Sequence, residues 1–318
     1  MTNVSSNESK IFIPCDKHLD FIFWVLDGAA GLVVLAGNFL TCIVIISSPI
    51  LRHNVMNVFL LSLAVADFLI GLIFVPGYAS FCESCEYALS KYCHILSSAK
   101  DLPLAGVTFN LLAISYDRYM AVFRPLHYHS HMNSLRVGII LSSAWGIPIV
   151  MIITRSLLHY FWSTSRIDDI IKIYNTFLVV AFVILPIIIL VVVNTMLTRA
   201  LQRQNCRIHV VKSEIVSENA STVVKEKEVM EKHTKRRKGT ISCIVVVLIF
   251  ILCWFPRAFN NVWSLANRNQ KINPVFRKIT IFFLIVQSSV NPFIYTMYRR
   301  EFRRAAKGFV NSLQFWRR

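Results

Sequence analysis

Seven apolar stretches, each about 20 residues or longer, alternate with polar stretches along this chain. A helix of that length crosses the hydrocarbon core of a bilayer. Because lipid offers the backbone no hydrogen-bond partners, each span is expected to be an α-helix. The alternating strand-length segments of a membrane β-barrel are absent from the sequence. We place the spans at 23–46, 56–78, 92–122, 135–155, 170–200, 237–265 and 273–297. The pattern predicts an all-α membrane protein built as a seven-helix bundle.

Composition and charge agree with this prediction. Of the 318 residues, 55% are hydrophobic and only 16% are charged, which is less charge than soluble proteins of this size carry. The net charge of +17 could indicate nucleic acid, but roughly 22 of the 34 basic residues fall on one side of the spans. This distribution favours a positive-inside bias and contact with anionic lipid, and it argues against a nucleic-acid partner. The basic positions on that side include Arg52, Arg124, Arg136, Lys232–Lys238 and Arg299–Arg304.

The charge bias also orients the chain. It predicts an extracellular tail over residues 1–22, a membrane domain over 23–297 with a cytoplasmic loop near 201–236, and a cytoplasmic segment over 298–318. No cleavable signal peptide is visible, since residues 1–21 contain no apolar core, so the first span is expected to direct insertion. Asn3 and Asn7 lie in glycosylation triplets on the outer tail, and we expect both to be glycosylated.

Four of the eight cysteines, Cys15, Cys82, Cys85 and Cys93, fall on the oxidising outer side. They can form two disulfides in three ways, among which the sequence does not choose. The outer loop near 156–170 contains no cysteine, so any partner of Cys93 must lie elsewhere. The spacing of Cys82 and Cys85 could suit a metal ion, but the outer location favours disulfides. We expect no metal site and no cofactor.

Each span carries one residue that a helix in lipid disfavours: Asn38, Asp67, Arg118, Trp145, Pro186, Pro256 and Pro292. A buried polar side chain needs a partner on a neighbouring helix, and an interior proline kinks its own helix. The third span ends with Asp117 beside Arg118, a carboxylate and a guanidinium at the membrane boundary. Such a pair is costly to place there and indicates function.

This ordered set resembles the rhodopsin-like (class A) G-protein-coupled receptors across nearly the whole chain. Each motif is weak alone, but the set in register is specific. The matching motifs are Gly37-Asn38, Leu63-Ala64-Val65-Ala66-Asp67, Asp117-Arg118-Tyr119, Trp145, Pro186, Cys253-Trp254-Phe255-Pro256 and Asn291-Pro292-Phe293-Ile294-Tyr295. The resemblance implies a non-enzymatic receptor of the plasma membrane with an extracellular ligand and a heterotrimeric G protein as partners. It also implies a short amphipathic eighth helix from Arg299, lying on the inner leaflet.

The resemblance also implies roles for individual residues. Arg118, released from Asp117, would receive the C-terminus of the G protein when the sixth span swings outward, and Trp254 with Pro256 would couple the ligand to that swing. The residues assigned to G-protein coupling and activation are Asp117, Arg118, Tyr119, Leu126, Asn291, Pro292 and Tyr295. Those assigned to a central polar pocket are Asn38 and Asp67.

Three positions depart from the family pattern. Many relatives carry an acid on the sixth span that locks the arginine, but the matching residue here is Arg236, so we predict appreciable basal signalling. Asn194 stands where a tyrosine is usual, and Val107 replaces the serine beside Asp67, which argues against sodium binding there. With few hydroxyl residues in the tail, phosphorylation by a receptor kinase and arrestin capture are expected to rely on Ser217, Ser221 and Thr222.

The ligand is expected to differ from a monoamine. Aminergic relatives have an aspartate eighteen residues before the Arg118 position, where this chain has Lys100, followed by Asp101. A second cation, Arg257, follows Pro256 and points toward the same cavity, so two cations suggest an anionic ligand such as a carboxylate or an acidic peptide. The competing interpretation is that Lys100 pairs with Asp101 or Asp27 and that Arg257 reaches the outer rim. The ligand-binding candidates are Lys100, Asp101, Arg257, Asn261, Tyr78, Tyr174 and Trp254, with Asn175, Trp263 and Arg277 also near the mouth.

Other functions of the same fold are less consistent with the sequence. The segment from Leu126 to Met132 resembles the branch that holds melanocortin, adenosine and cannabinoid receptors, and a monoamine or lipid ligand is the alternative within the fold. A retinal pigment needs a lysine where this chain has Ile285. A transporter should show repeated halves or several midplane charges, and an intramembrane enzyme needs clustered catalytic groups, neither of which is found.

Overall fold

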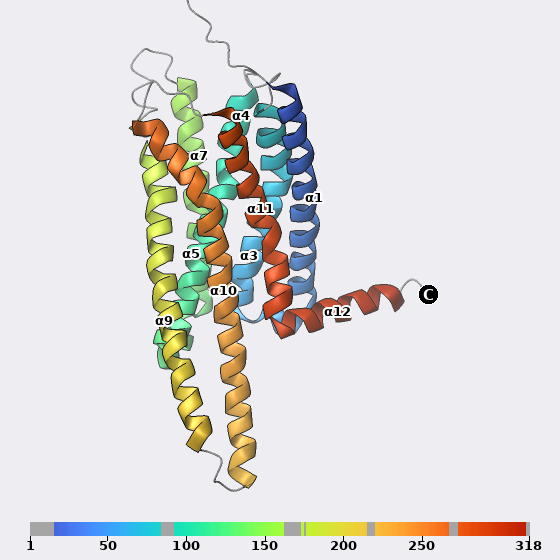
Figure 1. Ribbon diagram of the computed structural model, residues 1–318, viewed down its shortest axis with the longest axis vertical. Helices are drawn as coiled ribbons and strands as arrows, with labels where there is room; N and C mark the ends of the chain where they lie inside the picture. Colours follow the sequence, from blue (N-terminus) through green and yellow to red (C-terminus); the bar gives the residue numbers. More distant parts are fainter. Residues whose placement is uncertain are drawn as a thin grey trace, which may run out of the picture.

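The computed structural model describes residues 16–83, 92–161, 173–174, 176–214, 220–266 and 273–315. Every regular element in these ranges is a helix, and the long helices lie side by side along one common direction (Figure 1). The first half holds α1 (Lys17–Ser47), α2 (Pro49–Arg52), α3 (Val55–Leu69), η1 (Ile70–Cys82), α4 (Tyr92–Ala99), α5 (Asp101–Phe123), η2 (Pro125–His127) and α6 (Tyr128–His131). The second half holds α7 (Ser134–Phe161), η3 (Val180–Ile184), α9 (Leu185–Glu214), α10 (Ala220–Ala266), α11 (Pro274–Tyr298) and α12 (Arg300–Phe315).

The prediction of a helical membrane bundle is confirmed. Six helical segments of the described chain are long and apolar enough to cross a membrane. The remaining predicted span consists of α4 followed by α5, which is less apolar because it carries Lys100, Asp101, Asp117 and Arg118. The side chains that face out of the bundle are largely apolar, such as Leu72 and Leu252, as a lipid environment requires.

The third span differs from its prediction, because a break at Lys100 divides it into α4 and α5. Proline has no N–H, so Pro103 cannot donate to the carbonyl of Ala99. The next contact, from the N–H of Leu104 to the carbonyl of Lys100, is stretched to 3.5 Å. The sequence interpretation named Pro186, Pro256 and Pro292 as kinks but overlooked Pro103, which places Lys100 and Asp101 at a helix break.

A second local departure is a π-helical stretch, η1, which contains Pro76 and completes the second span. A shorter one, η3, precedes Pro186 in the fifth span. π-Helical turns widen a helix by one residue and are common near functional sites. Neither stretch was predicted, since the hydrophobic pattern of a π-helix and that of an α-helix are hard to separate by sequence.

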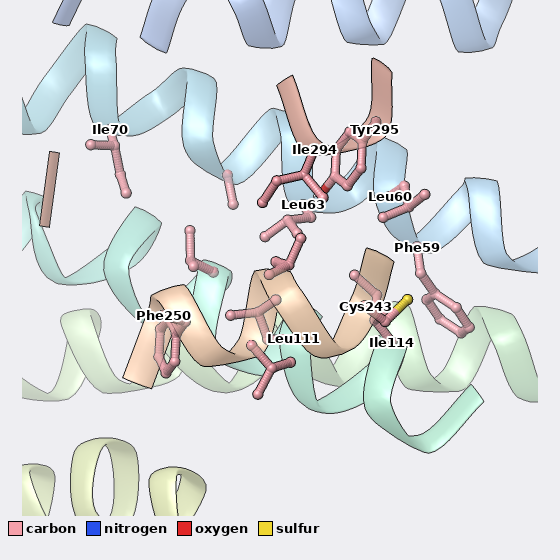
Figure 2. Close-up of a cluster of buried hydrophobic side chains, with 14 of the residues drawn as sticks. Phe59, Leu60, Leu63, Ile70, Leu111, Ile114, Cys243, Phe250, Ile294 and Tyr295 are labelled. Atoms are coloured by element: carbon pink, nitrogen blue, oxygen red, sulfur yellow. The ribbon is translucent and has the colours of Figure 1, made fainter. Parts of the chain in front are cut away.

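The core lies along the centre of the bundle, where large apolar side chains from several spans meet. Figure 2 shows Phe59 and Leu63 of α3, Leu111 of α5, Phe250 of α10 and Tyr295 of α11 converging there, all fully buried or nearly so. This packing fixes the relative positions of the helices that carry the polar residues described below.

At the end of the bundle that was predicted to be cytoplasmic, α9 and α10 extend beyond the other helices (Figure 1), and both extensions fall within the predicted loop near 201–236. That loop is therefore helical on both sides of residues 215–219, which lie outside the described chain. The last helix, α12, leaves the bundle at a steep angle (Figure 1). Its Phe302 is buried with its ring 6.4 Å from that of Tyr295, while Arg303, Arg304 and Lys307 are exposed.

Candidate functional site

We call the two ends of the bundle outer and inner after the orientation predicted from the sequence, with the start of α1 at the outer end. The outer half contains a cavity of about 280 Å³ between α5, α7, the fifth span, α10 and α11. Its apolar walls come mainly from Leu104, Met151, Ile152, Phe182 and Leu284. Trp254 and Pro148 also line it. The cavity is of the size that holds a small metabolite. Its charged and amide side chains come from the start of α5, from α7 and from α10.

Five of the seven predicted ligand-binding residues line this cavity: Lys100, Asp101, Trp254, Arg257 and Asn261. The other two lie beside it. Tyr78 sits beneath Lys100, whose ammonium nitrogen is 4.8 Å from the centre of the tyrosine ring. Tyr174 donates from its hydroxyl to the carbonyl of Met151 at 2.8 Å, which joins the fifth span to α7. Asn175 lies outside the described residues.

An ion triad forms the polar wall of the cavity. Lys100 Nζ lies 2.7 Å from one oxygen of Asp101, and Arg155 Nη1 of α7 lies 2.5 Å from the other. Lys100 therefore pairs with Asp101, as the competing interpretation of that residue held. Arg155 was missed by the sequence interpretation because nothing in its local sequence marks it, and only the packing of α7 against α5 brings it to Asp101.

Arg257 is the remaining cation of the cavity. It makes no ion pair or hydrogen bond with any residue in the described part of the chain, and it is only half-buried. Three cations, Lys100, Arg155 and Arg257, line the same space as a single carboxylate, that of Asp101. The wall therefore has an excess of positive charge, and Arg257 is the cation that is left for a bound group.

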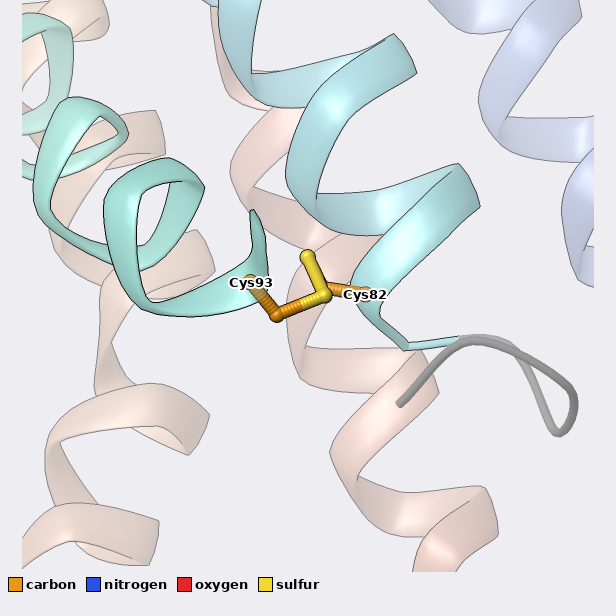
Figure 3. The surroundings of a disulfide bond; sticks show 2 residues. All are labelled: Cys82 and Cys93. Atoms are coloured by element: carbon orange, nitrogen blue, oxygen red, sulfur yellow. A yellow bond between two sulfur atoms is a disulfide. The ribbon is translucent and has the colours of Figure 1, made fainter. Parts of the chain in front are cut away.

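The outer rim is fastened by a disulfide and two ion pairs. Cys82 at the end of η1 is bonded to Cys93 of α4 (Figure 3), while Cys15 and Cys85 lie outside the described residues. Lys278 Nζ of α11 lies 2.5 Å from Asp20 of α1, and Arg277 Nε lies 2.8 Å from Glu83. Arg277 is thus engaged at the rim rather than in the cavity. The predicted glycosylation sites, Asn3 and Asn7, lie outside the described chain.

The centre of the bundle holds the predicted polar residues. Asn291 Nδ2 of α11 donates to Asp67 Oδ2 at 2.7 Å, and Asn38 Nδ2 of α1 donates to the carbonyl of Ser288 at 3.1 Å. Both bonds join different spans, as the cost of burying polar groups in lipid requires. Val107, which stands where the family pattern has a serine, is fully buried, and its side chain offers no oxygen to a sodium ion.

The inner end holds a closed ion pair. Arg118 donates from Nε to Asp117 Oδ2 at 2.8 Å and from Nη2 to the same oxygen. The hydroxyl of Tyr128 donates to the other oxygen, Asp117 Oδ1, at 2.7 Å. Burial and the adjacent Asp117 charge raise the pKa of Tyr128, so the hydroxyl remains a donor at neutral pH. The side chain of Arg236 lies outside the described residues. Gly239 of α10 lies against Arg118.

The other coupling candidates surround this pair. Leu126 is 93% exposed, whereas Tyr295 and Pro292 are buried in α11. Tyr119 packs its ring 4.9 Å from that of Phe123. No group of three or more potential metal ligands occurs among the described residues. The polar groups thus gather at an outer cavity, a central buried cluster and an inner ion pair, along one bundle.

Comparison with known proteins gives an independent result. The family model described as 7 transmembrane receptor (rhodopsin family) matches residues 37–295. The histamine H2 receptor of Cavia porcellus is 29% identical over 86% of this chain and 75% of its own length. The adenosine receptor A2a of Canis lupus familiaris is 26% identical over 92% and 73%. Trace amine-associated receptor 8b of Rattus norvegicus is 24% identical over 95% and 89%.

Proposed function

The chain belongs to the rhodopsin family of seven-transmembrane receptors, and from this premise we propose that it signals the binding of a small anionic ligand to a heterotrimeric G protein. The ligand occupies the outer cavity and the G protein engages the inner end beside Arg118. The receptor sits in the plasma membrane with its N-terminus outside, and Asn3 and Asn7 carry glycans.

One observation carries the ligand assignment: Arg257 lines the cavity without a partner among the described residues, while Lys100 and Arg155 share the carboxylate of Asp101. A guanidinium presents a planar pair of N–H donors that matches a carboxylate. A ligand carboxylate at Arg257 would also lower the repulsion among three neighbouring cations. We therefore place the anion of the ligand on Arg257.

The size and walls of the cavity narrow the ligand class. A space of about 280 Å³ lined by Trp254, Phe182 and several aliphatic side chains suits a small carboxylate with an apolar body. A peptide could place only one acidic residue in it. Trp254 forms part of the wall two residues from Pro256, so a ligand in the cavity contacts the kinked part of α10 directly.

A cationic amine is the second candidate, because two of the relatives are named for histamine and trace amines and because Asp101 lines the cavity. For an amine to bind, it would have to displace Lys100 or Arg155 from Asp101 and would then lie beside two or three fixed cations. Repulsion between like charges in a partly buried site makes this costly. The geometry favours the anion.

The test is G-protein dissociation in transfected cells exposed to a panel of small carboxylates and, separately, a panel of small amines. We expect activation by a carboxylate, with potency reduced tenfold or more in Arg257→Gln because a charge-assisted bond to the ligand is lost. The matched control is Arg277→Gln, which removes a cation that Glu83 already holds at the rim. Activation by an amine that Arg257→Gln leaves unchanged and Asp101→Asn abolishes would establish the second candidate instead.

Regulation follows the same family pattern. We propose that a receptor kinase phosphorylates Ser217, Ser221 and Thr222 and that arrestin then binds. Ser221 and Thr222 lie in the first turn of α10, whose extension projects into the cytoplasm in the proposed orientation (Figure 1), and Ser217 lies outside the described residues. Loss of arrestin recruitment in the triple alanine variant, with G-protein dissociation retained, is the expected result.

A further inference from the structure

Asn194 occupies an unusual position on the buried face of α9. The neighbouring residues on that face, Leu190, Leu197 and Leu201, are buried and apolar, at the spacing of successive helical turns. Asn194 interrupts this stripe and is itself only 5% exposed. A buried amide in a membrane helix is costly unless it is hydrogen-bonded, so its partner indicates what it does.

The partner is the backbone of another helix. Asn194 Nδ2 donates to the carbonyl oxygen of Ile244 at 3.2 Å, and Ile244 belongs to α10, which lies beside α9 (Figure 1). By contrast, the hydroxyls of Thr195 and Thr198 on the same helix donate only to carbonyls of α9 itself, those of Val191 and Asn194. Among these three polar side chains, Asn194 alone joins the fifth span to the sixth.

The level of this bond along α10 matters for signalling. Ile244 lies twelve residues below the kink at Pro256, or about 18 Å along the helix axis. Gly239, which lies against Arg118, is five residues farther down. A swing of the inner half of α10 by about 10° around Pro256 would move Ile244 by roughly 3 Å, which is enough to break a 3.2 Å hydrogen bond.

We infer that Asn194 is a positioning residue that holds the inner half of α10 against α9 in the resting receptor. Its bond exists only while α10 is closed over Arg118, so it stabilises the closed state relative to the open one. Many relatives carry an acid that pairs with the residue at the Arg118 position and so keeps the sixth span closed, which Arg236 cannot do. In this chain the bond from Asn194 to Ile244 restrains the sixth span instead. The inference does not depend on the identity of the ligand, since it concerns only the movement of α10 relative to α9.

The experiment compares ligand-free signalling of Asn194→Leu with that of the parent, at equal numbers of receptors on the cell surface. Leucine has the same number and branching of side-chain heavy atoms as asparagine and continues the apolar stripe, so the shape is nearly kept while the donor is lost. Interhelical hydrogen bonds in membranes have strengths that correspond to a change of roughly 3- to 20-fold in the ratio of open to closed receptor. Basal G-protein dissociation should rise by a factor in that range.

Two further variants and one distance measurement separate a positioning role from a merely structural one. Thr198→Val removes a bond within α9 and should leave basal signalling unchanged. Asn194→Gln keeps the amide donor and should restore a basal level below that of Asn194→Leu. In purified receptor carrying spin labels at the inner ends of α9 and α10, Asn194→Leu should increase the population with the longer distance.

Two results would overturn the inference. One is a basal level and a label distance in Asn194→Leu that equal those of the parent. The other is an equal rise in Thr198→Val, which would show that any perturbation of α9 has the same effect. If Asn194→Leu fails to reach the surface, Asn194→Ser replaces it, because serine is too short to reach Ile244. A label distance in Asn194→Ser equal to that of the parent would then overturn the inference.

Discussion

At the scale of single residues, the inner end is organised around one carboxylate. Asp117 is fully buried and accepts hydrogen bonds from Arg118 on one oxygen and from Tyr128 on the other. Because Arg118 has no other ion-pair partner among the described residues, its position depends on this carboxylate. A change at Asp117 should therefore act on the signalling equilibrium more strongly than a change at any neighbour.

Neutralising this carboxylate should activate the receptor. In Asp117→Asn the guanidinium of Arg118 is left as an uncompensated buried charge in the closed state, which costs several kcal/mol. We expect basal G-protein dissociation to rise roughly tenfold, since part of that cost also falls on the open state. Tyr128→Phe, which leaves the ion pair intact, should give a smaller rise.

The measurement is constitutive signalling at matched surface expression, with Tyr116→Phe as the control because Tyr116 is exposed on the outside of the same helix. A basal signal in Asp117→Asn no greater than that of Tyr116→Phe would contradict the assignment of Asp117 as the main restraint on Arg118.

At the scale of elements, the disulfide between Cys82 and Cys93 fastens α4, the short outer part of the broken third span, to the end of the second span (Figure 3). The break at Lys100 separates α4 from α5, so this bond and packing hold α4 in place. Lys100, at the break, and Asp101, the first residue of α5, line the cavity. Because α4 adjoins them directly, we expect the disulfide to stabilise the ligand site as well as the fold.

Removing the disulfide should destabilise the outer end. The variants Cys82→Ala, Cys93→Ala and the double variant should each lower the thermal unfolding midpoint of purified receptor, by an amount that corresponds to about 2–4 kcal/mol. The double variant should be no less stable than either single one, because all three lack the same bond. Cys42→Ala, which removes a free cysteine, is the control. Equal midpoints for all four variants would show that the bond contributes nothing to the fold.

The same elements show what could and could not be predicted from the sequence. The membrane helices and the inner Asp117–Arg118 pair depend on local pattern, so both were found. The partner of Cys93 depends on how helices meet, and three pairings were equally allowed until packing brought Cys82 to it. Arg155 reaches Asp101 from a helix 54 positions away, and no pattern within α7 announces it. The break at Lys100 could have been inferred from Pro103.

At the scale of the whole molecule, the polar groups follow the length of the bundle from the outer cavity to the inner ion pair. Trp254 lines the cavity, packs its ring 5.2 Å from that of Phe250, and belongs to the same helix as Gly239, which lies against Arg118. One helix, α10, thus contacts both ends. A bundle with two arrangements of that helix would let a ligand and a G protein bias one equilibrium.

The orientation of the bundle gives a prediction at this scale. A third acceptor triplet, Asn219-Ala220-Ser221, lies in the loop near 201–236. If the N-terminus is extracellular, Asn3 and Asn7 are glycosylated and Asn219 is not, because that loop faces the cytosol. Treatment of the expressed receptor with an N-glycosidase should increase its electrophoretic mobility, and Asn3→Gln with Asn7→Gln should abolish that change. A glycosidase-sensitive band in the double variant would contradict the topology.

The central claim is that the outer cavity and the inner end are coupled, and the affinity of an activating carboxylate measured with and without nucleotide-free G protein tests it most directly. Coupling of the usual size predicts an affinity for the carboxylate roughly 5- to 150-fold higher when the G protein is bound. In Arg118→Ala the G protein should raise that affinity by a smaller factor. An affinity that is the same with and without the G protein, in a receptor shown to bind both, would contradict the claim.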